Sequence, residues 1–145
     1  MIRADPQWAG GDYAPDAGPR DGMLVARKLG MMTYRSAEEW LERFGRDRVE
    51  RADAGEQPFE MTFQVESYLA ANAARFVERF DANCYLYLSQ SMDLFEVAEH
   101  GGGSAERAMA GVDARRALIA GASTDWLFPL WQQRELAGLL EQAGA

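Results

Sequence analysis

Histidine and cysteine each occur only once in this sequence of 145 residues, as His100 and Cys84. A single cysteine cannot form an internal disulfide, which is typical of a protein from a reducing compartment. Protein-built zinc sites use several clustered histidines and cysteines, so no metal site is expected. We interpret His100, which precedes a run of glycines, as an exposed loop residue, and Cys84 as a small core residue on an apolar helix.

Basic residues are also few, with 15 Lys and Arg against 23 Asp and Glu, and the net charge is −8. Such a balance argues against nucleic acid or an anionic membrane as a partner. No apolar run is long enough to span a membrane, and the first residues do not contain the apolar core of a signal peptide. Together with the single cysteine, these features predict a cytoplasmic location.

The apolar residues that are present recur mainly at helical spacing, which predicts a mostly α-helical chain. Two terminal signals are clear. Ser36 and Glu39 form an S-x-x-E capping box, and Gly45 is placed to end the helix that they start. The polar residues 46–57 are expected to be a solvated linker. The expected helices run from Pro19 to about Tyr34, over 36–45, 65–80 and 85–95, from Ser104, and from Pro129.

The stretch from Ala117 to Pro129 differs from the rest, because a short apolar run is followed by Gly121 and then by a single acid, Asp125. Four to eight apolar residues bounded by turns predict a buried strand over 117–120, although a buried helix has the same pattern. Acids that follow such strands lie where open α/β sheets bind ligands. Asp125 is therefore either a catalytic acid or a simple cap of the following helix.

Arg27 and Tyr34 are seven residues apart on the first predicted helix, which is two turns, so both project from one face. A guanidinium in line with a phenol hydroxyl can bind a carboxylate through charged hydrogen bonds. A surface arginine beside a half-buried tyrosine is the simpler interpretation of the same spacing.

Several motifs together resemble the homoserine O-acyltransferases of the α/β-hydrolase fold and their serine O-acyltransferase relatives. They occur in the order of that family and extend over the length of the chain. The motifs are I-R-A-D-P-x-W-x-G-G-D-Y from Ile2, A-R-K-L-G-M-M-T-Y-R-S from Ala26, F-x-V-E-S-Y-L from Phe63, R-F-D-A-N-x-Y-L-Y-L from Arg79 and S-T-D-W-L-F-P from Ser123.

The resemblance implies a helical lid over residues 1–110 and a strand–helix part of an incomplete α/β-hydrolase core over 111–145. It assigns Asp125 as the acid of the catalytic triad, and Arg27 and Tyr34 as lid residues that hold the amino-acid acceptor. The implied reaction transfers an acyl group from acyl-CoA, as co-substrate, to the hydroxyl of L-homoserine or L-serine, in methionine or cysteine biosynthesis. No bound cofactor is implied.

The other two members of a Ser–acid–His triad are absent from the sequence. No serine lies within G-x-S-x-G, and His100 precedes Asp125, whereas the base follows the acid in this fold. The chain is therefore predicted to be a fragment that is inactive alone, or else a non-catalytic helical interaction module derived from the lid. Apolar residues on more than one side of the helix over 85–95 further predict a dimer through residues 63–95.

Overall fold

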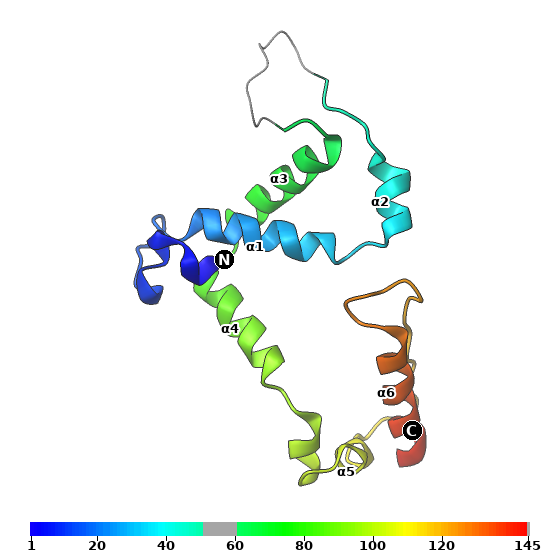
Figure 1. Ribbon diagram of the computed structural model, residues 1–145. Helices are drawn as coiled ribbons and strands as arrows, with labels where there is room; N and C mark the ends of the chain where they lie inside the picture. The colour runs from blue at the N-terminus through cyan, green and yellow to red at the C-terminus, as the bar shows by residue number, and fades with distance from the viewer. Residues whose placement is uncertain (51–60, 145) are drawn as a thin grey trace. The chain divides into compact units, whose positions relative to one another are not determined.

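The computed structural model describes residues 1–50 and 61–144, and the chain separates into two compact units, Met1–Leu88 and Ser89–Ala145 (Figure 1). The described residues are mainly helical. Their α-helices are α1 (Arg20–Met32), α2 (Ala37–Phe44), α3 (Gln64–Val77), α4 (Ala82–Asp93), α5 (Ala105–Ala110) and α6 (Leu130–Ala143), and the 3₁₀ helices are η1 (Ile2–Ala4), η2 (Pro6–Gly11) and η3 (Val97–Gly101). These bounds confirm the helices expected from apolar periodicity to within a few residues.

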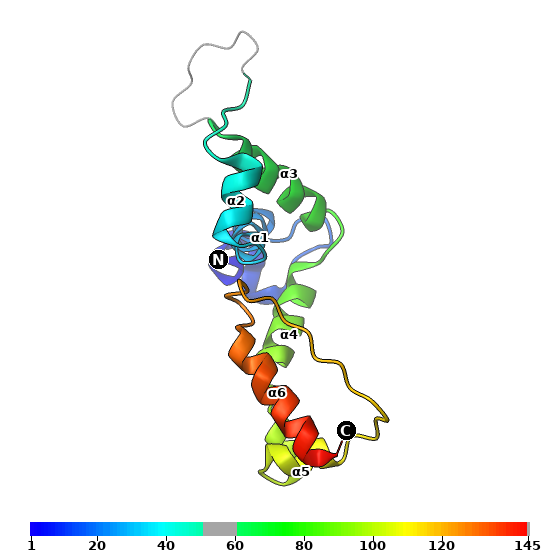
Figure 2. The same cartoon turned by 90° about the vertical axis from the view of Figure 1, so that its right-hand side faces the viewer.

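The first unit is built around α1 and α3, which lie across one another in Figures 1 and 2. Met23 of α1 is almost fully buried, and it packs with Ile2 and Ala82 at the centre of the apolar core. Partly buried side chains from η2, α3 and the start of α4 surround this centre: Trp8, Tyr13, Ala26, Phe76, Val77, Phe80, Tyr85 and Leu86. The core therefore fixes α1 against α3, and this pair forms the site described below.

The chain's first segment is attached to the start of α4 by hydrogen bonds. Trp8 donates its indole N–H to Oδ1 of Asn83 at 3.0 Å, and Asn83 donates its amide to the carbonyl of Gly11 at 2.8 Å. The Tyr13 hydroxyl donates to Oδ2 of Asp81 at 2.7 Å. Two motifs some 70 residues apart, from Ile2 and from Arg79, thus contact each other directly.

Asp81 is the charged centre of this contact. Its other oxygen accepts from the backbone N–H of Cys84 at 2.9 Å, and this bond, with that from Tyr13, holds the pKa of Asp81 below its usual range. Burial raises the pKa of Tyr13, and the hydrogen bond to Asp81 raises it further. The carboxylate therefore stays ionised, and the phenol stays protonated as its donor, around neutral pH.

Gly22 allows the first segment to approach α1 closely. A Cβ at this position would lie 2.9 Å from the carbonyl oxygen of Met1 and 3.0 Å from the Cα of Ile2. The Gly22 backbone N–H also donates to Oδ2 of Asp5 at 2.7 Å. A side chain here would separate η1 from α1, and Ile2 would lose its place in the core.

Helix α2 is capped as the sequence predicts at both ends. The Ser36 hydroxyl accepts from the Glu39 N–H at 3.2 Å, and Gly45 ends the helix with a φ of +48°. The carboxylate of Glu39 pairs with Arg35, so only the serine half of the expected capping box is formed by these contacts. Trp40 and Phe44 pack on Tyr68, which joins α2 to α3.

The second unit contains η3, α5 and α6, and α5 contacts both of the others. Ser104 caps α5 by accepting from the Arg107 N–H at 3.2 Å, as expected. Arg107 also donates to the carbonyls of Gly101 and Gly102, which holds the glycine run against α5. His100 is exposed, as expected, but it lies within η3 and not in a loop, and its ring lies beside that of Phe95.

Two expectations are wrong. Residues 117–120 have no regular secondary structure, and no strand occurs anywhere in residues 1–50 or 61–144 apart from an isolated bridge between Arg48 and Phe63. A strand needs neighbouring strands to receive its hydrogen bonds, and none lies beside this segment. Leu118 is accordingly 90% exposed. Cys84 is also exposed, because it lies on the side of α4 away from the Ile2–Met23–Ala82 core.

The expected linker over 46–57 extends into residues 51–60, which lie outside the described part of the chain. None of the described helices has the length and apolar character needed to cross a bilayer.

Candidate functional site

The seven-residue spacing of Arg27 and Tyr34 brings their side chains together, as predicted. Nη1 of Arg27 donates to the Tyr34 hydroxyl at 3.2 Å. The guanidinium also lies over the ring of Phe76 from α3, 4.3 Å from its centroid, and 5.3 Å from the centroid of Tyr34. Stacking on two rings and a hydrogen bond fix the position of a side chain that is otherwise flexible.

The Nε–H of Arg27 is buried and has no hydrogen-bond partner in the described part of the chain. Leaving a buried donor of a charged group unpaired costs about 1–3 kcal/mol or more. Because Nη1 is already used by Tyr34, the remaining edge of the guanidinium is the one formed by Nε and Nη2. That edge has the geometry for a forked pair of hydrogen bonds to a carboxylate.

A cavity of about 820 Å³ opens at this position between α1, α3 and the turns that follow them. It is lined by Arg27, Met31, Tyr34, Arg35, Tyr68, Asn72, Arg75, Phe76, Arg79 and Phe80. Four of these residues are arginines, and no aspartate or glutamate is among them. In a chain with a net charge of −8, this concentration of positive charge favours an anionic ligand.

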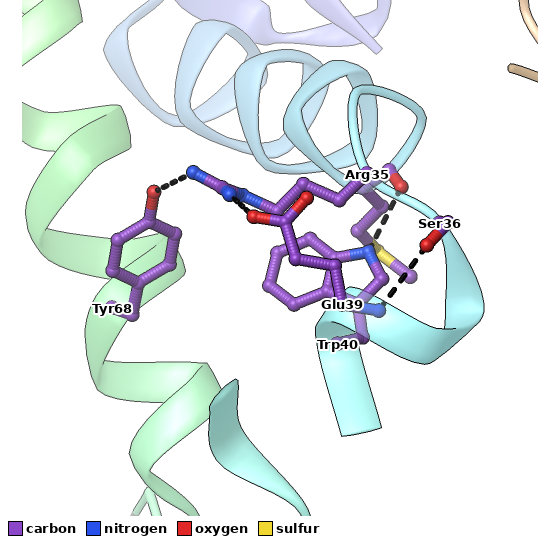
Figure 3. Close-up of polar contacts among 6 residues, drawn as sticks. Arg35, Ser36, Glu39, Trp40 and Tyr68 are labelled. Carbon is purple, nitrogen blue, oxygen red and sulfur yellow. Dashed lines mark hydrogen bonds and ion pairs between the residues drawn. The ribbon is translucent and has the colours of Figure 1, made fainter. Parts of the chain in front are cut away.

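The arginines that line the cavity differ in how many of their donors are already bonded to other residues of the protein. Arg35 forms an ion pair with Glu39 and donates Nη2 to the Tyr68 hydroxyl at 3.1 Å, as Figure 3 shows. Its charge is therefore largely neutralised within the protein, and it joins α2 to α3. Arg75 donates to Oδ1 of Asn72 at 2.8 Å, and Asn72 is itself held by its bond to the Tyr68 carbonyl.

Arg27 and Tyr34 are predicted from the sequence, whereas the residues contributed by α3 and the turn after it are not. Tyr68, Asn72, Arg75 and Arg79 follow one another at intervals of four, three and four residues, which places them on one face. That spacing could have indicated a polar surface next to the apolar stripe. Only the packing of α1 on α3 shows that this surface faces Arg27.

Asp125 belongs to the second unit. Its Oδ1 accepts from the backbone N–H groups of Leu127 at 3.0 Å and Phe128 at 2.8 Å, so the side chain stabilises a turn. It does not cap α6, whose N-cap is Pro129. The interpretation of Asp125 as a simple helix cap is therefore wrong. The turn holds its Oδ1 in place and leaves Oδ2 available to a further donor.

Known proteins with similar sequences cover almost the whole chain. No family model matches it. A serine O-succinyltransferase of Litchfieldella anticariensis is 67% identical over 143 residues, which are 99% of this chain and 39% of the relative. A serine O-succinyltransferase of Frateuria aurantia is 53% identical over 144 residues, with the same two shares. The chain therefore spans about two fifths of the length of these relatives.

Solved structures agree with the sequence relatives. The structure of a homoserine O-acetyltransferase from Bacillus anthracis matches 99% of this chain and 37% of its own, with a TM-score of 0.78 and 27% identity. The structure of an esterase matches 99% of this chain and 38% of its own, with a TM-score of 0.76, and its 22% identity supports a likeness of fold alone. Over almost its whole length the chain is thus similar in sequence to part of the serine O-succinyltransferases, and similar in fold to part of a homoserine O-acetyltransferase.

Proposed function

We propose that this chain is the acceptor-binding and triad-acid segment of an acyl-CoA-dependent O-acyltransferase that acts on the hydroxyl of L-serine or L-homoserine. Arg27 and Tyr34 bind the acceptor's carboxylate, and Asp125 orients the histidine base. The relatives named serine O-succinyltransferase favour serine as the acceptor and a succinyl group as the acyl group. The nucleophilic serine and the base histidine are contributed by sequence outside this chain, so the chain alone is inactive.

One observation carries the proposal: the buried, unpartnered Nε–H of Arg27 in a cavity rich in arginine. An amino acid offers its α-carboxylate to the Nε and Nη2 edge of Arg27. The Tyr34 hydroxyl keeps that edge turned toward the ligand by accepting from Nη1. Holding the acceptor in a fixed orientation lowers the entropic cost of attack by its hydroxyl, a contribution that reaches several kcal/mol in well-oriented systems.

The first experiment replaces the matching segment of a full-length serine O-succinyltransferase with this chain. The chimera is expected to transfer a succinyl group from succinyl-CoA to L-serine or L-homoserine, whereas the isolated chain shows no turnover. Release of free coenzyme A, measured with a thiol reagent, follows both reactions. Turnover by the isolated chain, or a folded but inert chimera, would contradict the proposal.

A dimer formed through residues 63–95 is a further part of the proposal. Several large apolar side chains of α4 and the residues after it are exposed: Tyr87 by 72%, Met92 by 70%, Leu94 by 71% and Phe95 by 64%. At about 25 cal/mol per Å² of apolar surface, covering such residues supplies a substantial driving force for association.

The purified chain is therefore expected to be dimeric at micromolar concentration and to dissociate on dilution. Tyr87→Glu, which places a charge on this surface, is expected to shift the chain to the monomer, whereas Gln132→Glu, at an exposed residue of α6 outside residues 63–95, serves as the control. Light scattering over a dilution series measures both. A monomer at every concentration, for the unmodified chain, is the result that excludes the dimer.

A further inference from the structure

The arginines of the cavity are more numerous than one amino-acid carboxylate can use. Arg27 and Arg35 are both half-buried; Arg27 meets the acceptor under the proposed function, and Arg35 is already paired with Glu39. Arg75 and Arg79 remain. Arg75 lies in the last turn of α3, and Arg79 lies in the turn that follows, where its backbone N–H bonds to the Phe76 carbonyl at 3.0 Å.

Arg75 and Arg79 line the same cavity as Arg27 but are exposed, so they form its solvent-facing side. Arg75 is directed by its bond to Asn72, which uses only Nη2. Its other donors face an environment without a carboxylate among the cavity's residues. Arg75 and Arg79 thus bring two positive charges to a cavity that no acid lines, and a polyanion can compensate both charges at once.

We propose that Arg75 and Arg79 form a second anion subsite, which binds phosphate groups of the acyl-CoA donor. This inference rests on the proposed function, since it assigns a place to that reaction's co-substrate. Phosphates are the anions for which planar, five-donor arginine side chains are best suited. The exposed position also fits the charged end of a long ligand that keeps contact with water, while its acyl end reaches deeper.

The alternative ligand of Arg75 and Arg79 is the carboxylate at the far end of a succinyl group. It predicts a different dependence of binding on the ligand and on salt. A small carboxylate carries less charge than a phosphate and would bind as well when supplied as free succinate. Phosphate recognition instead makes binding depend on the nucleotide part of coenzyme A and fall steeply with salt. One kind of measurement distinguishes the two ligands, because the side-chain N–H signals of Arg75 report directly which of them makes contact.

The test uses the whole 145-residue chain, with its arginine Nε–H signals followed by NMR during titration. Coenzyme A is expected to shift the signals of Arg75 and Arg79, dephospho-coenzyme A to shift them less, and pantetheine, which carries no phosphate, to leave them unchanged. Equal shifts with pantetheine, saturation by succinate alone, or no shift with coenzyme A would each overturn the inference.

Variants separate binding from structure. Arg79→Gln is expected to weaken coenzyme A binding about tenfold or more, which is the loss of one charged hydrogen-bonding group. Arg134→Gln, on an exposed arginine of α6 outside the cavity, is the matched control. A purely structural role at the end of α3 would lower the melting temperature and leave the affinity of the folded variant unchanged.

The same variants in the chimera distinguish this inference from the proposed function. Arg79→Gln is expected to raise the KM for succinyl-CoA and leave the KM for the amino acid unchanged. An active chimera in which Arg79→Gln changes neither constant leaves the proposed function intact and removes the phosphate subsite. An inert chimera refutes the proposed function, while the titration of the isolated chain still decides whether Arg75 and Arg79 bind phosphate.

Discussion

Asp125→Asn is expected to lower kcat of the chimera by about ten-thousandfold, the scale of loss when a triad acid becomes an amide. The carboxylate holds the base histidine in the tautomer that accepts the serine proton, and it stabilises the imidazolium that forms. An amide directs an N–H toward the same ring nitrogen, so the wrong tautomer is favoured. The KM for the acceptor should change little, because Asp125 does not touch the amino acid in this proposal.

Asp125→Asn tests the chemical role of the carboxylate without disturbing the fold, because the turn around Asp125 can be kept by asparagine. Oδ1 accepts from Leu127 and Phe128, and an asparagine carbonyl oxygen can accept the same two hydrogen bonds. The variant is therefore expected to keep its circular dichroism spectrum and its melting temperature within a few degrees. Asp113→Asn, an exposed acid of the same unit, is the control and should retain full activity.

A loss of less than tenfold in Asp125→Asn would show that Asp125 is not the triad acid. A variant that loses its fold together with its activity would show instead that the turn depends on the charge of the carboxylate. Single-turnover kinetics of acyl-enzyme formation separate the chemical step from product release, so they are the measurement of choice.

Local signals account for the parts of the fold that the sequence predicts well. Ser36, Gly45 and Ser104 act on backbone groups within a few residues of themselves, so their roles follow from sequence spacing alone. Pro129 precedes α6 for the same kind of reason, because its fixed φ suits the start of a helix. Apolar periodicity gives the extent of α1 and α3 in a similar way.

Non-local pairing accounts for what the sequence does not predict. The apolar run over 117–120 has the composition of a strand, but a strand is completed by hydrogen bonds to neighbours that the described residues do not supply. Cys84 was placed in the core because α4 is apolar on several sides, and sequence does not show which side faces Met23. The Tyr13–Asp81 contact likewise joins segments far apart in the chain.

The candidate site likewise has one part that follows from local spacing and another that depends on non-local packing. Arg27 and Tyr34 share one helix and its following turn, so their spacing alone brings them together. Arg75 comes from α3 and Arg79 from the turn after it, and charged residues on or beside an amphipathic helix are usually interpreted as part of its solvated face. Their contribution to the cavity depends on the packing of α1 against α3, in which Met23 of α1 shares the apolar core with Phe76 and Val77 of α3.

Arg27→Lys in the chimera is expected to raise the acceptor KM by about ten- to a hundredfold, since losing a forked, charged hydrogen bond costs about 1.5–3 kcal/mol. Lysine keeps the charge but has no planar Nε–Nη2 edge, and it stacks less well on Phe76. The carboxylate of the acceptor does not change during acyl transfer, so the lost interaction is equal in ground state and transition state. kcat at saturating acceptor should therefore stay within a few-fold of the unmodified chimera.

Two further variants show whether the effect belongs to this site. Arg20→Lys makes the same change on the same helix, at an exposed residue outside the cavity around Arg27, and should leave the acceptor KM unchanged. Tyr34→Phe removes the hydroxyl that accepts from Nη1, so it should raise the acceptor KM by a smaller factor than Arg27→Lys. Initial rates over a range of L-serine and L-homoserine at fixed succinyl-CoA measure all three. An acceptor KM that Arg27→Lys leaves unchanged would remove Arg27 from the acceptor site, and the buried Nε–H would then need another ligand.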